Sequence, residues 1–275
     1  MAARMACSGA PTREGKLAPS PMAASRVTSP QYPNFEPDAA LAISSTPMRI
    51  GFFGGSFDPP HRGHVGLARL AMERMHLDRV LFAPVGVQPL KRDRPQASFE
   101  DRVAMTRLAV EGEPGMEVSL VDAPRNDGRP NYTLNTVRGL RNALAPGDEL
   151  FFLMGADSFL GIGRWHRAAD LLLASDFIVA SRPGFELNRI TAALPPGIAV
   201  ASCDSEPGDN HLVLCLRGAS GRESRLYLLP DLRELASATG IRASLERGRV
   251  PRGELDPAVA EYIREHGLYE ERGVG

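Results

Sequence analysis

From Met48 onward, short apolar runs alternate with stretches whose apolar residues recur every three or four positions. The runs predict buried strands and the stretches predict helices packed on a sheet. We expect strands at 50–53, 80–84, 116–120, 150–154, 177–180 and 225–229, and helices at 64–75, 98–110, 133–143, around 171–173 and at 256–266. This alternation predicts an α/β fold, a Rossmann-like doubly wound parallel sheet with a small C-terminal helical portion.

Two segments lack such a pattern. Residues 1–46 are rich in Ala, Pro and Ser and show no sustained period, so we expect a disordered N-terminal extension before a domain at 47–270. Residues 182–225 contain turn signals, and the apolar run at 212–216 cannot be assigned to an element.

Composition excludes several classes of protein. The formal net charge of -1 provides no general attraction to nucleic acid or to an anionic membrane, so phosphate recognition has to be local. No apolar stretch approaches membrane-spanning length. Cys7, Cys203 and Cys215 show neither metal-ligand spacing nor a disulfide framework, which is typical of a reducing compartment and predicts a cytoplasmic protein. The oligomeric state stays open, a homo-oligomer included.

The segment Gly54 to His64 carries the strongest chemical signal. It reads GGSFDPPHRGH and directly follows the first predicted strand. Its glycines can adopt positive φ and let a ligand approach the backbone. His61 and His64 stand where a helix begins, so both imidazoles can donate to an anion at the positive end of the helix dipole. The segment therefore predicts a site for a phosphate chain.

Other motifs fall at matching places along the chain. Gly54, Gly155 and Ser181 each follow a predicted strand, and the carboxyl ends of parallel strands meet at one edge of a sheet. We therefore expect these three positions to share one rim. The chain has no Gly-x4-Gly-Lys-Ser/Thr sequence, so phosphate binding is not by a P-loop.

Residues 54–64 resemble the H-x-G-H signature of the nucleotidyltransferase superfamily. Three later segments look like those of bacterial nicotinate-nucleotide adenylyltransferases. They are Met154 to Ser158 followed by Trp165 to Arg167, Ser181 to Gly184, and Ser237 to Arg242. The resemblance extends from Met48 to Tyr269 and implies a sheet of the nucleotidyltransferase type.

The resemblance also implies a reaction. ATP and nicotinate mononucleotide would give deamido-NAD and pyrophosphate by direct in-line attack, without a covalent intermediate. His61, His64 and Arg242 would be the catalytic residues, as donors that stabilise the charge on the phosphates. Mg²⁺ would accompany ATP, held by phosphates and water, with no metal ligands from the chain.

The resemblance assigns residues to both substrates. Those implied for ATP are Gly54, Gly55, Ser56, Phe57, Gly63, His64, Ser237, Thr239 and Arg242. Those implied for the mononucleotide are Lys91, Tyr132, Thr133, Asp157 and Trp165. Structural alternatives stay open, since Ser237 and Asp157 are also typical helix caps and a single tryptophan is often a core residue. Ala238 and Asn135 depart from the family, which usually has serine and aspartate there.

Two rival functions stay open. A pantetheine-phosphate adenylyltransferase has the same signature, but threonine is more frequent in place of His61, and the segment Trp165 to Arg167 is lacking. A non-catalytic nucleotide-binding protein could share the fold, although it need not keep both histidines and the Ser237 to Arg242 segment.

Overall fold

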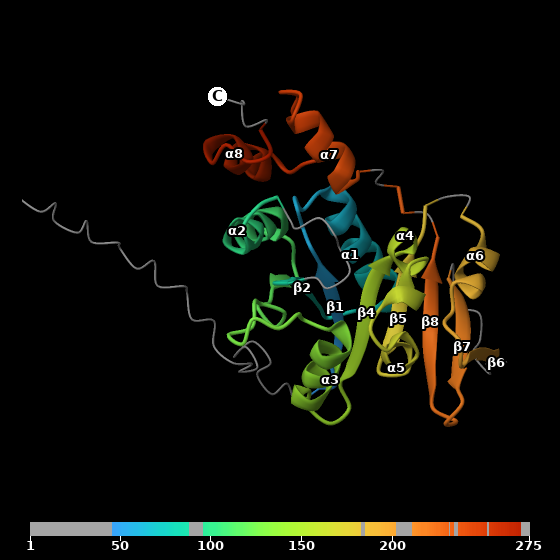
Figure 1. The fold of residues 1–275 in the computed structure, drawn as a ribbon. Coiled ribbons are helices and arrows are strands. Elements are labelled where there is room, and N and C mark those ends of the chain that lie inside the picture. Colours follow the sequence, from blue (N-terminus) through green and yellow to red (C-terminus); the bar gives the residue numbers. More distant parts are fainter. Residues whose placement is uncertain are drawn as a thin grey trace, which may run out of the picture. The chain divides into compact units, whose positions relative to one another are not determined.

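In the part of the chain that the computed structural model describes, eight strands form one sheet. The described residues are 46–87, 96–182, 185–201, 211–230, 232–233, 236–251 and 253–270. The strands are β1 (Arg49–Gly55), β2 (Arg79–Pro84), β3 (Met116–Val118), β4 (Glu149–Gly155), β5 (Asp176–Ala180), β6 (Ile198–Ala201), β7 (Leu212–Gly218) and β8 (Glu223–Leu229). Their order in the sheet is β3-β2-β1-β4-β5-β8-β7-β6 (Figure 1).

The predicted parallel sheet is confirmed for the strands from β3 to β8 in that order. The strands β7 and β6 were not predicted, and both pair antiparallel with their neighbours. The turn from β7 to β8 explains the reversal. The amide of Gly218 donates to the carbonyl of Arg222 at 2.9 Å, and a connection this short closes a hairpin, whereas parallel strands need a crossover.

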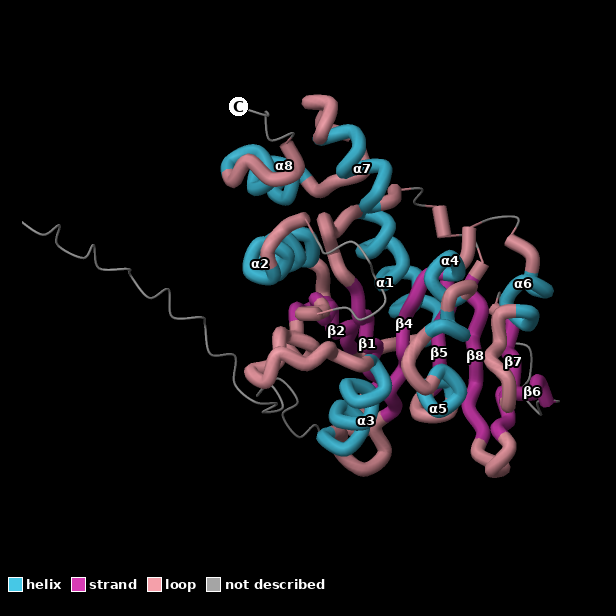
Figure 2. The backbone as a smooth tube through the Cα atoms, viewed as in Figure 1, coloured by secondary structure: helices cyan, strands magenta, loops and turns pink. Residues whose placement is uncertain are grey.

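The helices of the described structure are α1 (Arg62–Met75), α2 (Phe99–Val110), α3 (Thr133–Ala143), α4 (Ala156–Phe159), α5 (Ala168–Leu172), α6 (Leu187–Ala192), α7 (Ala238–Leu245) and α8 (Pro257–Glu265), with a 3₁₀ turn at Ile162–Arg164. The longer predicted helices are confirmed, whereas the short helices α4 and α6 were not predicted. Figure 2 shows how loops join these helices to the strand ends. The C-terminal helical portion is α7 and α8, beside α1 and α2 (Figure 1).

Side-chain alternation along the strands divides the core into two layers. In β1, Phe52 packs in the layer under α3, α4, α5 and α6, whereas Phe53 packs in the layer under α1, α2, α7 and α8. In β4, Phe152 and Phe151 divide in the same way. Successive strand residues point to opposite faces, so a fully apolar strand supplies both layers at once.

Some expectations need correction. Cys215 in β7 is disulfide-bonded, so the absence of disulfides was wrongly predicted. Gly54 and Gly55 do not adopt positive φ, because both belong to β1 and pair with Ala83 and Pro84 of β2. Almost all of the predicted extension at 1–46 lies outside the described residues. No helix among the described residues is long and apolar enough to span a membrane.

Candidate active site

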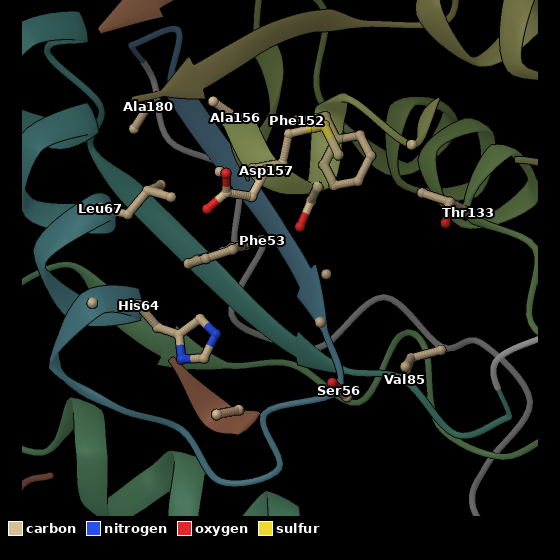
Figure 3. A pocket seen from close by; sticks show the side chains of 18 of the residues that line it. Phe53, Ser56, His64, Leu67, Val85, Thr133, Phe152, Ala156, Asp157 and Ala180 are labelled. Atoms are coloured by element: carbon tan, nitrogen blue, oxygen red, sulfur yellow. The ribbon is translucent and has the colours of Figure 1, made fainter. Parts of the chain in front are cut away.

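A cavity of about 580 Å³ lies at the carboxyl ends of the central strands. Gly54, Gly155 and Ser181 all line it, which confirms the predicted common rim. Figure 3 shows His64 and Thr133 toward opposite sides of this pocket, with Asp157 between them. The crevice outside the strand ends is where open α/β sheets bind their ligands.

The two histidines of the motif lie face to face in this cavity. His61 is the residue before α1, and its ring stacks on that of His64 with the centroids 3.7 Å apart. The backbone N–H of His61 donates to Nδ1 of His64 at 3.2 Å. Because Nδ1 is the acceptor, neutral His64 carries its proton on Nε2. His64 therefore has an N–H donor in a ring that lines the cavity.

His61 is held neutral. Burial, followed by the positive charge of Arg182, lowers its pKa to about 4. Its Nδ1 has no hydrogen-bond partner in the described structure. Arg182 also lines the cavity, although the sequence analysis gave it no role. The segment Ser181 to Gly184 had marked this position without indicating its chemistry.

Gly63 keeps the start of α1 close to the C-terminal part of the chain. A Cβ there would lie 3.0 Å from Nδ1 of His61 and 3.4 Å from the carbonyl oxygen of Ala236. Glycine is therefore needed here for packing of protein against protein. Gly63 also lines the cavity, and its contact with ATP stays a prediction. Gly54 and Gly55 play a similar part, because a Cβ on them would contact the rings of Phe52 and Phe57 at 3.1 Å.

Phe57, predicted to contact ATP, is buried beneath the site. It is 1% exposed and does not line the cavity. Phe57 has a φ of 47°, and its ring packs against those of Phe53, Phe82 and His64. The centroids of the Phe57 and His64 rings are 5.0 Å apart. Ser56, the preceding predicted residue, does line the cavity (Figure 3).

Another part of the cavity wall brings together the residues predicted for the mononucleotide. Tyr132 precedes α3 and its ring lies 4.2 Å from that of His166, and Thr133 is the first residue of α3. Trp165 lines the cavity, and its ring centroid lies 6.1 Å from that of Phe152, so its side chain also packs against the hydrophobic core. Asp157 lies in the first turn of α4 and lines the cavity. Lys91 lies outside the described residues.

Of the three residues predicted to bind the outer phosphates of ATP, one lines the cavity and two do not. Ser237 lines the cavity, and its Oγ also accepts the amide of Gly240 at 3.1 Å, so it caps α7. Thr239 is exposed and does not line the cavity. Arg242 does not line it either, and its Nη1 donates to the carbonyl of Asp58 at 2.7 Å.

Ala238 and Asn135 are the two positions at which the chain differs from the residues usual in the family that it resembles. Ala238 lines the cavity and Asn135 does not. Ala238 is the first residue of α7 and offers no hydroxyl there. Asn135 is exposed on α3, so the missing charge does not alter the cavity wall.

Asp122 is a site residue that the sequence analysis missed. It lines the cavity, is 3% exposed and accepts the hydroxyl of Thr136 at 2.7 Å. Burial raises the pKa of its carboxyl to about 6, against the lowering effect of hydrogen bonds from Thr136 and Asn131. An aspartate in a loop carries no local signal of such burial. Among the described residues, no group of three or more His, Cys, Asp or Glu could hold a metal ion.

Known proteins are similar to this chain in sequence and in fold. The family described as cytidylyltransferase-like matches residues 52–244. A protein of Laribacter hongkongensis, named a probable nicotinate-nucleotide adenylyltransferase, is 40% identical over 81% of this chain and 94% of its own length. The protein of that name from Stenotrophomonas maltophilia is 39% identical over 81% and 96%. The nicotinic acid mononucleotide adenylyltransferase of Plasmodium falciparum, solved with NaAD, superposes with a TM-score of 0.57 at 17% identity, covering 81% of this chain and 97% of that one.

Proposed function

The chain belongs to the cytidylyltransferase-like family, and we propose that it is a nicotinate-nucleotide adenylyltransferase of NAD biosynthesis. It transfers the adenylyl group of ATP to nicotinate mononucleotide and releases pyrophosphate. The observation that carries the proposal is one cavity holding the stacked His61–His64 pair together with Trp165 and the Tyr132–His166 pair. Such a cavity offers phosphate donors and flat apolar surfaces to two nucleotides at once.

The phosphate region is suited to in-line displacement. The mononucleotide phosphate is already an anion, so the protein has to align two anions and stabilise charge as it moves to pyrophosphate. Nε2–H of His64 is fixed as a donor by the bond from the His61 amide to Nδ1. Arg182 supplies positive charge beside His61. Neutral imidazoles act here as donors and not as bases, because the attacking oxygen has no proton to lose.

The opposite region is suited to the pyridine ring. Trp165 is anchored on Phe152 and leaves part of its surface to the cavity, as a stacking platform needs. Thr133 at the start of α3 brings a helix N-terminus to the wall, which favours a carboxylate. This is the basis for preferring nicotinate over nicotinamide mononucleotide. Lys91 and Asp157 stay predicted contacts of the mononucleotide.

Mg²⁺ enters as part of the ATP complex, held by phosphate oxygens and water. Ser237, Thr239 and Arg242 stay predicted ligands of the outer phosphates. For Arg242, this role requires that its guanidinium reach past the carbonyl of Asp58, which it contacts in this structure. The cytoplasmic location also stays a prediction.

The test is pyrophosphate release from ATP with three acceptors: nicotinate mononucleotide, nicotinamide mononucleotide and pantetheine phosphate. We expect the first to be preferred. Better turnover of pantetheine phosphate favours the rival enzyme, and no turnover with any acceptor favours a nucleotide-binding protein.

Replacing both His61 and His64 by alanine is expected to lower kcat by about 10³-fold or more, since each lost donor of this kind costs about 10²–10³. The matched control is His76→Asn at the other end of α1, where the exposed His76 has a φ of 50° that asparagine tolerates. This control should keep full activity. Intact turnover in a folded His61/His64 double variant would end the proposal.

A further inference from the structure

Asp58 is a buried residue in the loop between β1 and α1, and its carboxylate binds groups from distant parts of the chain. The residue is 4% exposed. It accepts the backbone amides of Gln96 and Ala97 at 3.0 and 3.1 Å, just before α2. It also accepts the hydroxyl of Tyr269 at 2.8 Å, from 211 positions further along the chain. A buried carboxylate with several donors is strongly fixed in place.

The backbone of the same loop is held from outside as well. The carbonyl of Ser56 accepts Nη1 of Arg102 in α2 at 2.7 Å. The amide of Arg62, the first residue of α1, donates to the carbonyl of Glu254 at 2.9 Å. The chain between β1 and α1 therefore has contacts to α2 before His61 and to the C-terminal part of the chain directly after it.

Tyr269 is built into this arrangement. It follows α8, is 7% exposed and adopts a φ of 65° that turns the chain back toward the loop. Burial, followed by the negative charge of Asp58, raises the pKa of its hydroxyl. The hydroxyl therefore keeps its proton and donates to Asp58 throughout the physiological range. Pro59 and Pro60, whose φ is fixed, connect Asp58 to His61.

We propose that Tyr269 is a positioning residue for the histidine pair and acts through Asp58. Its hydroxyl fixes the carboxylate, the carboxylate fixes the loop, and the two prolines pass this placement on to His61 and, through the amide-to-Nδ1 bond, to His64. The C-terminal segment is thus a working part of the active site. This inference rests on the proposed function for its kinetic test, but its structural test is independent of it.

The test compares Tyr269→Phe with Tyr262→Phe. Tyr262 in α8 donates its hydroxyl to Asp101 of α2 at 3.0 Å, so the control loses a similar bond between the C-terminal segment and α2 without touching the loop. We expect Tyr269→Phe to lower kcat about tenfold with the KM for nicotinate mononucleotide unchanged within twofold. Tyr262→Phe should stay within twofold in both. A merely stabilising role of Tyr269 would give the two variants the same kinetics below their melting temperatures.

Hydrogen exchange of the amides in residues 61–65 provides the second measurement, without substrate. Faster exchange there in Tyr269→Phe than in Tyr262→Phe supports the proposal, and equal rates overturn it. If the wild-type protein turns over no acceptor, the proposed function fails while this exchange comparison still decides the inference.

A double-variant cycle tests whether Tyr269 acts through Asp58 or independently of it. Asp58→Asn keeps one acceptor oxygen but replaces the other by a donor. If Tyr269 acts through Asp58, the kcat loss of the combined variant is smaller than the product of the two single losses. In a sample where Tyr269→Phe does not fold, Asp58→Asn alone is measured in the same way, and unchanged kcat in that variant counts against the proposal, because Oδ2 of Asp58 no longer accepts from the amide of Gln96.

Discussion

Gly63→Ala should separate activity from stability. The glycine is the second residue of α1, and an added Cβ would lie 3.0 and 3.1 Å from two atoms of the His61 ring and 3.4 Å from the carbonyl oxygen of Ala236. Contacts this close force a neighbour to move by a few tenths of an ångström. The ring of His61 is the movable partner, since the carbonyl belongs to a backbone segment that leads into α7.

Two opposing effects set the stability of this variant. Alanine is favoured over glycine inside a helix by about 1 kcal/mol. Overpacking a close contact costs about 1–3 kcal/mol. The net loss is therefore about 0–2 kcal/mol, which lowers the melting temperature by no more than about 8 °C at about 2–4 °C per kcal/mol. The activity has no such compensation. We expect kcat to fall about tenfold or more, since misplacing a donor in a site of this kind costs about 1.4 kcal/mol or more of transition-state stabilisation.

Gly139→Ala is the matched control, because an added Cβ at that position in α3 meets no atom within 4 Å. It should gain up to about 1 kcal/mol in stability and keep full turnover. Both variants are measured by urea unfolding and by pyrophosphate release at saturating substrates. Should Gly63→Ala gain stability as Gly139→Ala does and keep its kcat, the inferred contact with His61 is wrong.

Two further predictions concern the other end of the cavity. Trp165→Ala should raise the KM for the mononucleotide about tenfold and leave the KM for ATP within twofold, because about 1–3 kcal/mol of base stacking is lost on one substrate only; equal effects on both KM values in initial-rate measurements would exclude a stacking platform. Asp122→Asn tests the buried carboxyl, whose pKa of about 6 in the folded state lies above its ordinary value of 3.8. Because the folded state holds this proton more tightly than the unfolded state, the protonated carboxyl contributes fully to the free energy of unfolding below pH 3.8. That contribution is lost as the pH rises to about 6. Asparagine does not titrate, so the free energy of unfolding of Asp122→Asn, measured with urea relative to wild type, should rise by up to about 3 kcal/mol across this window and stay constant above it. A difference that does not depend on pH would refute the burial argument.

Local pattern was enough to predict most of the framework. The strands and helices carry their own periodicity, and local sequence also caps α2 at Ser98, whose Oγ accepts the amide of Asp101 at 3.0 Å. The motifs at Gly54, Gly155 and Ser181 could be placed together because strand ends in a parallel sheet share an edge. The β7–β8 hairpin could also have been predicted, since a glycine, Gly221, stands in the short turn between the two strands and adopts a φ of 76° there.

What could not be predicted depends on contacts between distant residues. Asp122 and Thr136 bond across a loop, and Asp58 and Tyr269 bond across most of the chain. Nothing in the composition around Tyr269 distinguishes it from Tyr262, whose hydroxyl serves a different partner. The positive φ expected of Gly54 and Gly55 was wrong for a related reason, because both residues pair with β2, a strand further along the chain.

These contacts imply a division of tasks inside the motif. The residues between β1 and α1 that are not histidine hold the loop still, through Asp58 and through carbonyls bonded to Arg102 and Arg242. The packing that does this also buries His61, and burial keeps it uncharged at neutral pH. A neutral imidazole can give direction to a hydrogen bond but contributes no net charge, so positive charge for the phosphates has to come from other groups. Arg182, which follows β5 and lines the cavity, is the residue that we propose for this role. Orientation and charge are thus supplied by different residues, which is why removing the histidines should affect kcat most, while removing Arg182 should weaken the binding of anionic substrates.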